Sequence, residues 1–273
     1  MEIIAELGAS HNQDYQTALE LVFAAQEAGA DTIKVQMFTA DQMTSKDGGI
    51  IPDGSWAGQD LHGLYAKAAM PVEFAGKLKK LAEKLNMGFI VSVYHPDMVK
   101  TAEEIGVQRY KIASYELPWT DLIKSVAKTK KPLIMSVGMA DYKEIELAVK
   151  TARNYHNDIT LLWCLNKYPA DVEQMNLATI PVLARAFGCK SGLSDHTQGY
   201  LAPVMALSLG ASVLEKHLQI NGGLDSSFAL LPTQFKAMTE IVRSAEKAMG
   251  QATYGGEKKL RRKKVKGRWI RTV

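Results

Sequence analysis

The sequence predicts an α/β protein folded as a single (β/α)8 barrel of the TIM-barrel type. Short runs rich in β-branched residues alternate with stretches of helical periodicity along nearly the whole chain. Eight such strand–helix units fit within about 250 residues, which is the usual size of this barrel. A doubly wound open sheet is the alternative, but Leu7-Gly8-Ala9-Ser10-His11 is not the glycine-rich phosphate turn expected after its first strand.

The predicted elements follow one another in regular order. Gly29 is a stop signal for the first helix, Pro71 suits a first helical turn, and Pro181 must lie near a break or a start. Residues 39–58, rich in Gly, Asp and Ser, are expected to be irregular, and loops of that length usually serve a site or are mobile. We expect strands at residues 3–7, 32–37, 88–93, 110–113, 132–137, 158–164, 190–193 and 212–216, and helices at 15–28, 61–69, 71–85, 96–105, 118–129, 141–154, 172–187, 201–209 and 232–249.

Charge separates the C-terminal segment from the rest of the chain. The formal net charge is +4, yet nine Lys or Arg residues lie at 258–271, and the remaining 24 basic residues face 29 acidic ones. We therefore expect the barrel at residues 1–250 and a basic tail or linker remnant at 251–273. A basic tail can contact nucleic acid or an anionic membrane. Because Trp269 is the only aromatic residue of the basic stretch and no nucleic-acid-binding motif is present, a solvated tail is favoured.

Composition points to an ordinary globular protein of a reducing compartment. Hydrophobic residues make up 47% of the chain and charged residues 23%. Cys164 and Cys189 form no CxxC motif and no disulfide framework, and both lie in apolar surroundings, so free buried thiols are expected. A strand pattern begins at Glu2 without a signal peptide, and no apolar run approaches the ~20 residues of a membrane span. We expect a cytoplasmic protein with no membrane partner.

Two histidines occupy equivalent positions of consecutive strand–helix units. The runs Leu193-Ser194-Asp195-His196 and Leu214-Glu215-Lys216-His217 each end an apolar strand-like segment. Adjacent parallel strands would bring His196 and His217 side by side at the carboxyl rim of the sheet, where ligands of such folds bind. Two neighbouring imidazoles can form half of a metal site. The plainer alternative is that each histidine only caps its strand by hydrogen bonding.

Polar side chains stand at the carboxyl end of every predicted strand. Lysines inside apolar strands are costly to bury without an anion, although a neighbouring acid would explain any one of them. Together with the serines they indicate a cradle for phosphate and carboxylate groups, beside a metal that could polarise a carbonyl. The sequence thus predicts an enzyme acting on a small polyanion and a carbonyl compound. The residues concerned are Glu6, Lys34, Gln36, Ser92, Lys111, Ser114, Glu116, Ser136, Asn166, Tyr168, Ser194, Asp195, His196, Glu215, Lys216 and His217.

The same residues carry a resemblance to the sialic acid synthase family. It covers residues 3–250, and a set of spaced matches is far more specific than one motif. The resemblance implies a TIM-barrel domain that condenses phosphoenolpyruvate with an N-acyl hexosamine, such as N-acetylmannosamine, into a nonulosonic acid of the neuraminic, legionaminic or pseudaminic type. The matching segments are Ile4-Ala5-Glu6-Leu7-Gly8 with His11-Asn12, Lys34-Val35-Gln36, 110–116, Ser136-Val137-Gly138-Met139, Asn166-Lys167-Tyr168-Pro169, 192–197 and Glu215-Lys216-His217.

The resemblance also implies a role for individual residues. His196 and His217 would hold a divalent metal, Mn²⁺ first and Mg²⁺ or Co²⁺ as alternatives. Glu6 would be the base for the water that attacks C2 of phosphoenolpyruvate, and Lys111 and Glu116 complete the implied catalytic set. The implied phosphoenolpyruvate ligands are Lys34, Ser92, Lys111, Ser114, Ser136, Asn166 and Ser194, and the implied sugar ligands are Gln36, Glu116, Tyr168 and Asp225.

The chain departs from the family pattern at several positions. Ser92-Val93-Tyr94 stands where the family has a Ser-Thr-Pro-type turn, Trp163 where it has a histidine, and Gly223-Leu224-Asp225-Ser226 where it has Gly-Pro-Asp-His. These departures bear on the acceptor sugar more than on the reaction type. Gly256-Glu257-Lys258-Lys259 resembles the start of the linker to the family's antifreeze-like domain. A homodimer is expected, and a separate antifreeze-like protein is a possible further partner.

Two other classes of function stay open on the sequence. An aldolase or lyase acting on a 2-keto sugar acid would need a Schiff-base lysine, for which Lys111 and Lys216 are candidates. A non-catalytic barrel that binds a sugar or a partner protein is suggested by the basic tail and the missing terminal domain. Glu6, Lys111 and the two histidines argue against the pure binder, because it has no need of a metal pair beside a carboxylate.

Overall fold

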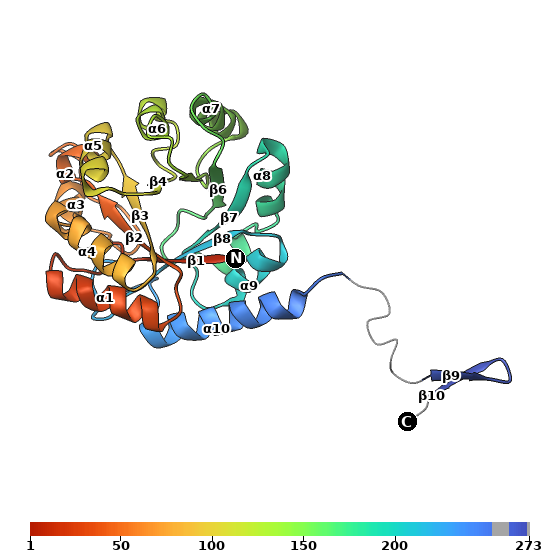
Figure 1. The fold of residues 1–273 in the computed structure, drawn as a ribbon. Coiled ribbons are helices and arrows are strands. Elements are labelled where there is room, and N and C mark those ends of the chain that lie inside the picture. The colour runs from red at the N-terminus through yellow and green to blue at the C-terminus, as the bar shows by residue number, and fades with distance from the viewer. Residues whose placement is uncertain (253–261, 272–273) are drawn as a thin grey trace.

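The computed structural model describes residues 1–252 and 262–271 and confirms the predicted barrel (Figure 1). The strands pair in parallel and in sequence order, and β8 closes the barrel by pairing with β1. Right-handed strand–helix–strand connections place the helices around this closed sheet. The strands are β1 (Glu2–Glu6), β2 (Thr32–Met37), β3 (Gly88–Val93), β4 (Tyr110–Ile112), β5 (Leu133–Ser136), β6 (Ile159–Trp163), β7 (Lys190–Asp195) and β8 (Val213–His217).

The helices begin and end where local sequence signals favour it. Asp14 caps α1 by accepting a hydrogen bond from the Thr17 backbone N–H, and Asp141 caps α7 in the same way through Glu144. Gly106 ends α5 in the left-handed conformation, with φ +79°. The helices are α1 (Tyr15–Glu27), α2 (Ala40–Met43), α3 (Leu61–Ala68), α4 (Val72–Lys84), α5 (Pro96–Ile105), α6 (Thr120–Ala127), α7 (Tyr142–Arg153), η1 (Val172–Gln174), α8 (Thr179–Phe187), α9 (Leu201–Ser208) and α10 (Pro232–Met249).

Two expectations about local structure were wrong. The stretch 39–58 was expected to be irregular, but it opens with α2, whose first turn is tied by a hydrogen bond from the Thr39 backbone N–H to the Gln42 side chain. The helix expected at 172–187 is divided into η1 and α8. Asn176 lies between them with φ +44°, which interrupts the helix, and Pro181 falls in the first turn of α8. Proline is tolerated there because first-turn N–H groups have no partner within the helix.

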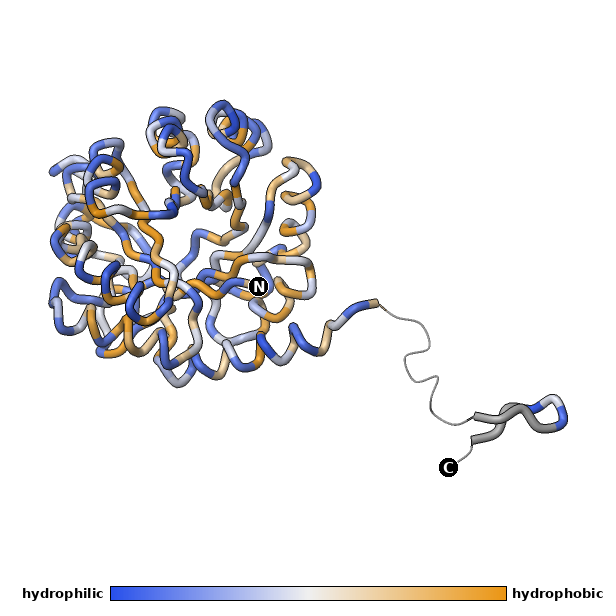
Figure 2. The backbone as a smooth tube through the Cα atoms, viewed as in Figure 1, coloured by the Kyte–Doolittle hydropathy of each residue, from blue (hydrophilic) through white to orange (hydrophobic). Residues whose placement is uncertain are grey.

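Strand residues alternate between the inside of the barrel and the side that faces the helices. A small apolar layer fills the barrel centre, formed by Ile4, Ile90, Ile134, Leu162 and Val213. The larger hydrophobic core lies between strands and helices, and Figure 2 shows hydrophobic residues running along the strands. Further toward the carboxyl ends of the strands, two residues after those of the central layer, the inward-facing side chains are polar. The polar side chains therefore lie at the carboxyl end of the barrel, above the central apolar layer.

The C-terminal stretch contains regular structure. Residues 262–271 form an antiparallel hairpin of β9 (Arg262–Val265) and β10 (Arg268–Arg271), joined through Lys266 and Gly267, which both have positive φ. The segment 256–259, which resembles a family linker, lies outside the described residues. The division of the chain into a barrel at 1–250 and a tail at 251–273 stays a prediction. Within residues 1–252 and 262–271, no helix is long and apolar enough to cross a membrane.

Candidate functional site

The two histidines predicted to act together lie side by side at the carboxyl end of β7 and β8. Their ring centroids are 5.6 Å apart, and both side chains are buried. Leu165 accepts a hydrogen bond at its carbonyl oxygen from His196 Nδ1 (3.0 Å), and Asp225 Oδ2 lies 3.0 Å from His217 Nδ1. An acceptor at Nδ1 leaves the Nε2 lone pair of each neutral ring free, which is the usual arrangement behind metal-binding histidines.

These contacts fit an open metal site. Burial, reinforced by neighbouring His217, lowers the pKa of His196 to about 3, so its ring is neutral and able to bind a cation at physiological pH. In the described part of the chain, no three His, Cys, Asp or Glu side chains are placed to share one ion. Two protein ligands would leave the other positions to water and substrate, as in catalytic sites. A divalent cation held by this pair is therefore compatible with the donor set.

Asp225 is anchored by the loop that follows β1. Its Oδ2 atom also accepts a hydrogen bond from the Ala9 backbone N–H (3.0 Å). Gly8 permits this close approach, because it has φ +48° and a Cβ at that position would lie 2.0 Å from the same Asp225 oxygen. The predicted sugar contact of Asp225 stays a prediction, while the structure places its carboxylate against His217.

The predicted lysines and carboxylates meet in the barrel mouth. Register pairs Glu6 with Lys34 on one side and with His217 on the other. Lys34 Nζ forms an ion pair with Glu6, lies 3.5 Å from Glu215 and donates a hydrogen bond to Ser92 Oγ (2.9 Å). Lys111 Nζ has its nearest carboxylate at 3.9 Å, again on Glu215. All four charged side chains are almost fully buried.

The two lysines differ in how well their charge is balanced. Burial opposes the charge of Lys34, but Glu215 and Glu6 outweigh it and raise the pKa of this lysine. Burial lowers the pKa of Lys111, and Lys34 lowers it further, and together they outweigh the opposing attraction of Glu215 and the smaller effects of Cys164 and Glu6. Burial works against the Glu215 charge too, yet Lys111 and Lys34 hold its pKa at about 2. Lys111 is thus the less well compensated of the two buried cations.

The remaining predicted anion ligands surround this pair. Ser194 Oγ donates to Glu215 (3.0 Å), and Ser114 Oγ accepts from the Met139 backbone N–H (2.9 Å). Asn166 Oδ1 accepts from the Cys164 thiol (3.2 Å), which leaves its amide N–H groups available. Ser136 Oγ is buried without a hydrogen-bond partner among the residues that the structure describes. Buried polar atoms are normally paired, so a free hydroxyl here is consistent with a ligand site.

The predicted sugar-side residues occupy the upper part of the mouth. Gln36 donates from Nε2 to Glu6 (3.1 Å), and the Tyr168 ring lies 4.4 Å from the His196 ring. Glu116 is largely buried in the loop after β4. Burial raises the pKa of Glu116 to about 7, although its own backbone hydrogen bond and Lys111 pull it down. Its Oε2 atom has no hydrogen-bond partner within the described residues.

The pKa of Glu116 predicts a pH dependence of stability. The folded pKa of about 7 exceeds the ordinary 4.5, so the folded protein keeps a proton that the unfolded chain releases. Stability from this proton is complete below about pH 4.5 and is lost as pH rises to about 7, by at most about 3 kcal/mol. We expect Glu116→Gln to raise the melting temperature relative to wild type at pH 8 but not at pH 5. A difference that is flat with pH, like that of an exposed Glu146→Gln control, would refute this assignment.

Lys216 and Asp195 are not in the pocket, contrary to expectation. Strand alternation turns both toward the helices, where Lys216 Nζ binds Asp195 Oδ2 at 2.7 Å and also contacts the Thr197 carbonyl oxygen. Both side chains are fully buried. The pocket therefore holds two lysines rather than three, and Lys216 is no candidate for a Schiff base. Trp163 also faces away, donating from Nε1 to the Met175 carbonyl oxygen (2.5 Å), so this departure from the family pattern does not line the site.

Some site residues were missed by sequence reasoning. Glu215 was noted at a strand end but given no role, although its position two residues before His217 indicates that it faces inward. It proves to be the counterion of both pocket lysines. Phe228 is buried against His217 (4.9 Å between ring centroids), and Trp56 packs on Phe228 from the loop before α3. No local signal could have found these two, because their contacts join distant loops.

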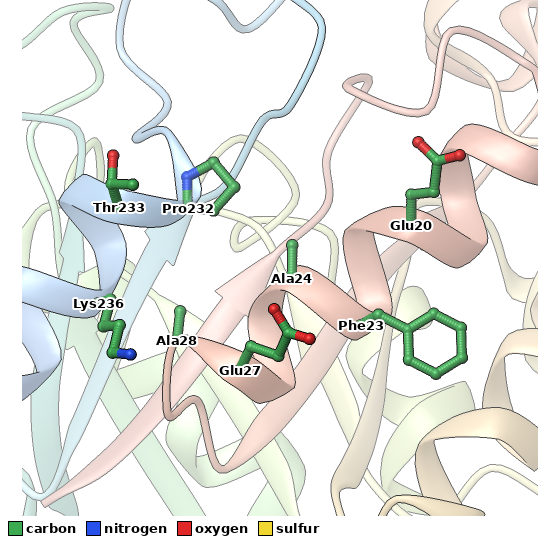
Figure 3. A pocket seen from close by; sticks show the side chains of 8 residues that line it. All are labelled: Glu20, Phe23, Ala24, Glu27, Ala28, Pro232, Thr233 and Lys236. Carbon is green, nitrogen blue, oxygen red and sulfur yellow. The ribbon is translucent and has the colours of Figure 1, made fainter.

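A second concave region lies outside the barrel mouth. A hollow of about 370 Å³ lies between α1 and α10, which run side by side in Figure 1. Figure 3 shows its lining, which is Glu20, Phe23, Ala24, Glu27, Ala28, Pro232, Thr233 and Lys236. These residues belong to the outer surfaces of two helices, and none of them is a predicted site residue. The chemistry that the sequence predicts is located at the strand ends instead.

The geometry defines a class of protein: an α/β barrel with buried lysines and carboxylates and two neighbouring histidines at its carboxyl rim. Residues 21–254 match the NeuB family, and the chain belongs to this family. It is 41% identical over 257 residues to the pseudaminic acid synthase of Helicobacter pylori, covering 92% of this chain and 76% of the relative. It is 34% identical to the N,N'-diacetyllegionaminic acid synthase of Legionella pneumophila, with coverages of 94% and 74%.

A solved structure supports the same assignment. The N-acetylneuraminic acid synthetase of Leptospira borgpetersenii, in complex with citrate, superposes with a TM-score of 0.86 at 26% identity. The match covers 94% of this chain and 88% of that one. The predicted membership of the sialic acid synthase family and the predicted fold are both confirmed.

Proposed function

We propose that the protein condenses phosphoenolpyruvate with an N-acyl hexosamine to give a nonulosonic acid and inorganic phosphate. The observation that carries this proposal is the combination, in one barrel mouth, of two buried lysines with a histidine pair whose Nδ1 atoms are already engaged. The NeuB family match and the synthase relatives support it. A small polyanion and a carbonyl compound are the substrates for which such a site is suited.

The phosphoenolpyruvate end is assigned to the anion cradle. Lys111 and Lys34 would bind the phosphate and carboxylate groups, assisted by Ser92, Ser136 and Ser194. Lys111 favours binding of an anion there, because its nearest carboxylate, on Glu215, lies 3.9 Å away and is shared with Lys34. Ser114 and Asn166 complete the set. Binding would then compensate a charge that the fold keeps buried at a cost.

The carbonyl end is assigned to the histidine pair. His196 and His217 would hold a divalent metal, which when bound supplies Lewis-acid polarisation of the sugar aldehyde. Asp225 and the Leu165 carbonyl oxygen keep the two rings in the required tautomer by accepting from Nδ1. Gln36, Glu116 and Tyr168 would contact the sugar around this carbonyl. Mn²⁺ is the proposed metal, with Mg²⁺ and Co²⁺ as alternatives.

The proposed reaction forms one C–C bond, adds water at C2 and releases phosphate. The C2–C3 double bond of phosphoenolpyruvate attacks the aldehyde carbon, forming a C–C bond, and the aldehyde oxygen takes up a proton. Water adds to the electron-poor C2 and gives a proton to Glu6, whose buried carboxylate is held by Gly8, Gln36 and Lys34. The C2–O bond to phosphate then breaks. Phosphate leaves with that electron pair, and the C2 hydroxyl loses its proton to give the keto acid.

We also propose a location and an assembly for the protein. Cys164 and Cys189 are free thiols, which suits a reducing cytoplasm. A homodimer is the family expectation, and a separate protein carrying the antifreeze-like domain is a possible partner. Size-exclusion chromatography with light scattering would test the dimer directly.

The proposed activity has a direct test. Purified protein with Mn²⁺ is supplied with phosphoenolpyruvate and a panel of aldoses that includes N-acetylmannosamine and the diacetamido hexoses. We expect phosphate release with at least one N-acyl hexosamine, and loss of this release on chelation of the metal. If metal-loaded protein released no phosphate with any aldose of the panel, with and without an added antifreeze-like domain, the proposal would be contradicted.

An aldolase acting through a lysine Schiff base is the second candidate. The lowered pKa of Lys111 favours it, because a neutral amine is the nucleophile of that mechanism. Borohydride treatment in the presence of pyruvate discriminates the two, since only the Schiff-base enzyme would gain a covalent adduct at Lys111. We expect no adduct.

A further inference from the structure

The segment 44–60, between α2 and α3, spans the barrel mouth, and we call it the strap. It leaves the barrel after β2, yet its central residues bond to the loops that follow β6 and β8. Ser55 Oγ donates to the Tyr168 carbonyl oxygen (2.5 Å) and lies 2.8 Å from Ser227 Oγ. Trp56 Nε1 donates to the Leu224 carbonyl oxygen (2.8 Å). The strap is thus joined to Tyr168 and to the neighbour of Asp225, two residues proposed to face the sugar.

Trp56 completes an aromatic layer over the histidine pair. Its ring centroid is 5.6 Å from that of Tyr168 and 6.0 Å from that of Phe228. Beneath it, the Tyr168 ring contacts His196 (4.4 Å) and the Phe228 ring contacts His217 (4.9 Å). Trp56 is therefore one ring removed from both proposed metal ligands. Three aromatic faces at this distance form an apolar surface beside a polar mouth.

The strap has internal structure of its own. It holds its own shape through backbone hydrogen bonds from Ile51 to Gln59 (2.9 Å) and from Gly58 to Ile51 (2.9 Å). Its attachments across the mouth are the side-chain hydrogen bonds of Ser55 and Trp56 and the packing of the Trp56 ring on Tyr168 and Phe228, and Ser55 is exposed. Gly54 and Gly58 have φ near +80° and no atom within 4 Å of a Cβ position, so both lie in open surroundings and in a conformation that glycine adopts readily. Opening the strap would require breaking only the attachments made by Ser55 and Trp56.

We propose that the strap is a lid over the acceptor sugar and that Trp56, with Tyr168 and Phe228, selects a sugar bearing an N-acyl group. An acetamido group has a planar amide and a methyl group, which pack well on aromatic faces, whereas a hydroxyl group in its place gains nothing there. The lid must open for the sugar to enter, and its closure over the bound sugar excludes water from the aldehyde. This inference rests on the proposed function, since it assigns a role to the acceptor side of the same site.

The test compares Trp56→Ala, Trp56→Phe and a matched control, Trp119→Ala, in the panel assay. Trp119 is partly exposed in the loop after β4, where it stacks on His95 rather than on the strap. We expect Trp56→Ala to raise KM for the preferred N-acyl hexosamine by about 10- to 100-fold, the range of a lost apolar contact surface. KM for phosphoenolpyruvate should stay within about twofold of wild type. Trp56→Phe should recover most of the affinity, and Trp119→Ala should resemble wild type.

Two further readouts make the outcome decisive. The preference for the N-acyl sugar over its hydroxyl counterpart should shrink in Trp56→Ala, which a general loss of stability would not produce. Amide hydrogen exchange in residues 44–60 should slow when the sugar is added to wild type, and should not slow in Trp56→Ala. Unchanged KM and preference in Trp56→Ala, with wild type active, would overturn the lid while leaving the proposed function intact. An inactive wild type would instead overturn the proposed function and, with it, the lid proposal that depends on that function.

Discussion

Replacing either His196 or His217 with alanine is expected to abolish metal binding and phosphate release together. Each ring already has its Nδ1 engaged, so removing one leaves a single imidazole that cannot hold a divalent cation with useful affinity. Phosphate release should fall by at least about a thousandfold, which corresponds to about 4 kcal/mol of transition-state stabilisation. The measurements are metal content of the purified protein and the initial rate of phosphate release.

A surface histidine gives the matched control. His62 is partly exposed beside Asp41 (2.8 Å) and away from the strand ends, so His62→Ala should keep both metal and activity. If His196→Ala lost activity but retained a full metal content, the metal would be held elsewhere, and the role assigned to the pair would be wrong. If both properties survived, the two histidines would only cap their strands.

Replacing Lys111 with methionine is expected to lower kcat/KM for phosphoenolpyruvate by about a hundred- to a thousandfold. Lys111 is the buried cation whose nearest carboxylate is as far as 3.9 Å away, on Glu215, and charge-assisted hydrogen bonds to phosphate or carboxylate contribute about 1.5–3 kcal/mol each. The loss should appear chiefly in kcat/KM for phosphoenolpyruvate, with little change in KM for the sugar. Steady-state kinetics with each substrate varied in turn would measure both effects.

Stability separates this substitution from a general disruption of the pocket. In Lys111→Met the relief of a buried charge opposes the lost attraction to Glu215, so the melting temperature should change little. An exposed Lys167→Met variant should behave as wild type in both assays. An unchanged kcat/KM for phosphoenolpyruvate in Lys111→Met would show that the anion binds elsewhere, and a collapse of the fold would show that Lys111 is structural.

Much of the site could be predicted from the sequence because strand-end residues of a parallel barrel converge on one rim. This geometric rule needs only the positions of the strands, and the periodicity of the chain places them within a few residues. Glu6, Lys34, Lys111, His196 and His217 meet as expected for this reason. The rule applies only to side chains that face the inside of the barrel. Lys216 and Asp195 were expected in the pocket because the alternation of side chains along a strand was not considered, and both face the helices.

The sequence by itself determined the barrel, the order of its elements, the polar strand ends and the histidine pair, since each follows from patterns within one strand or between consecutive units. Only the tertiary structure decided which lysine is compensated, because that depends on distances from Glu215 to Lys34 and to Lys111. It also decided the pKa of Glu116, which burial sets, and the path of the strap from β2 to the loops after β6 and β8. Bonds such as that of Trp56 with Leu224 join residues far apart in the chain, and no local pattern encodes them.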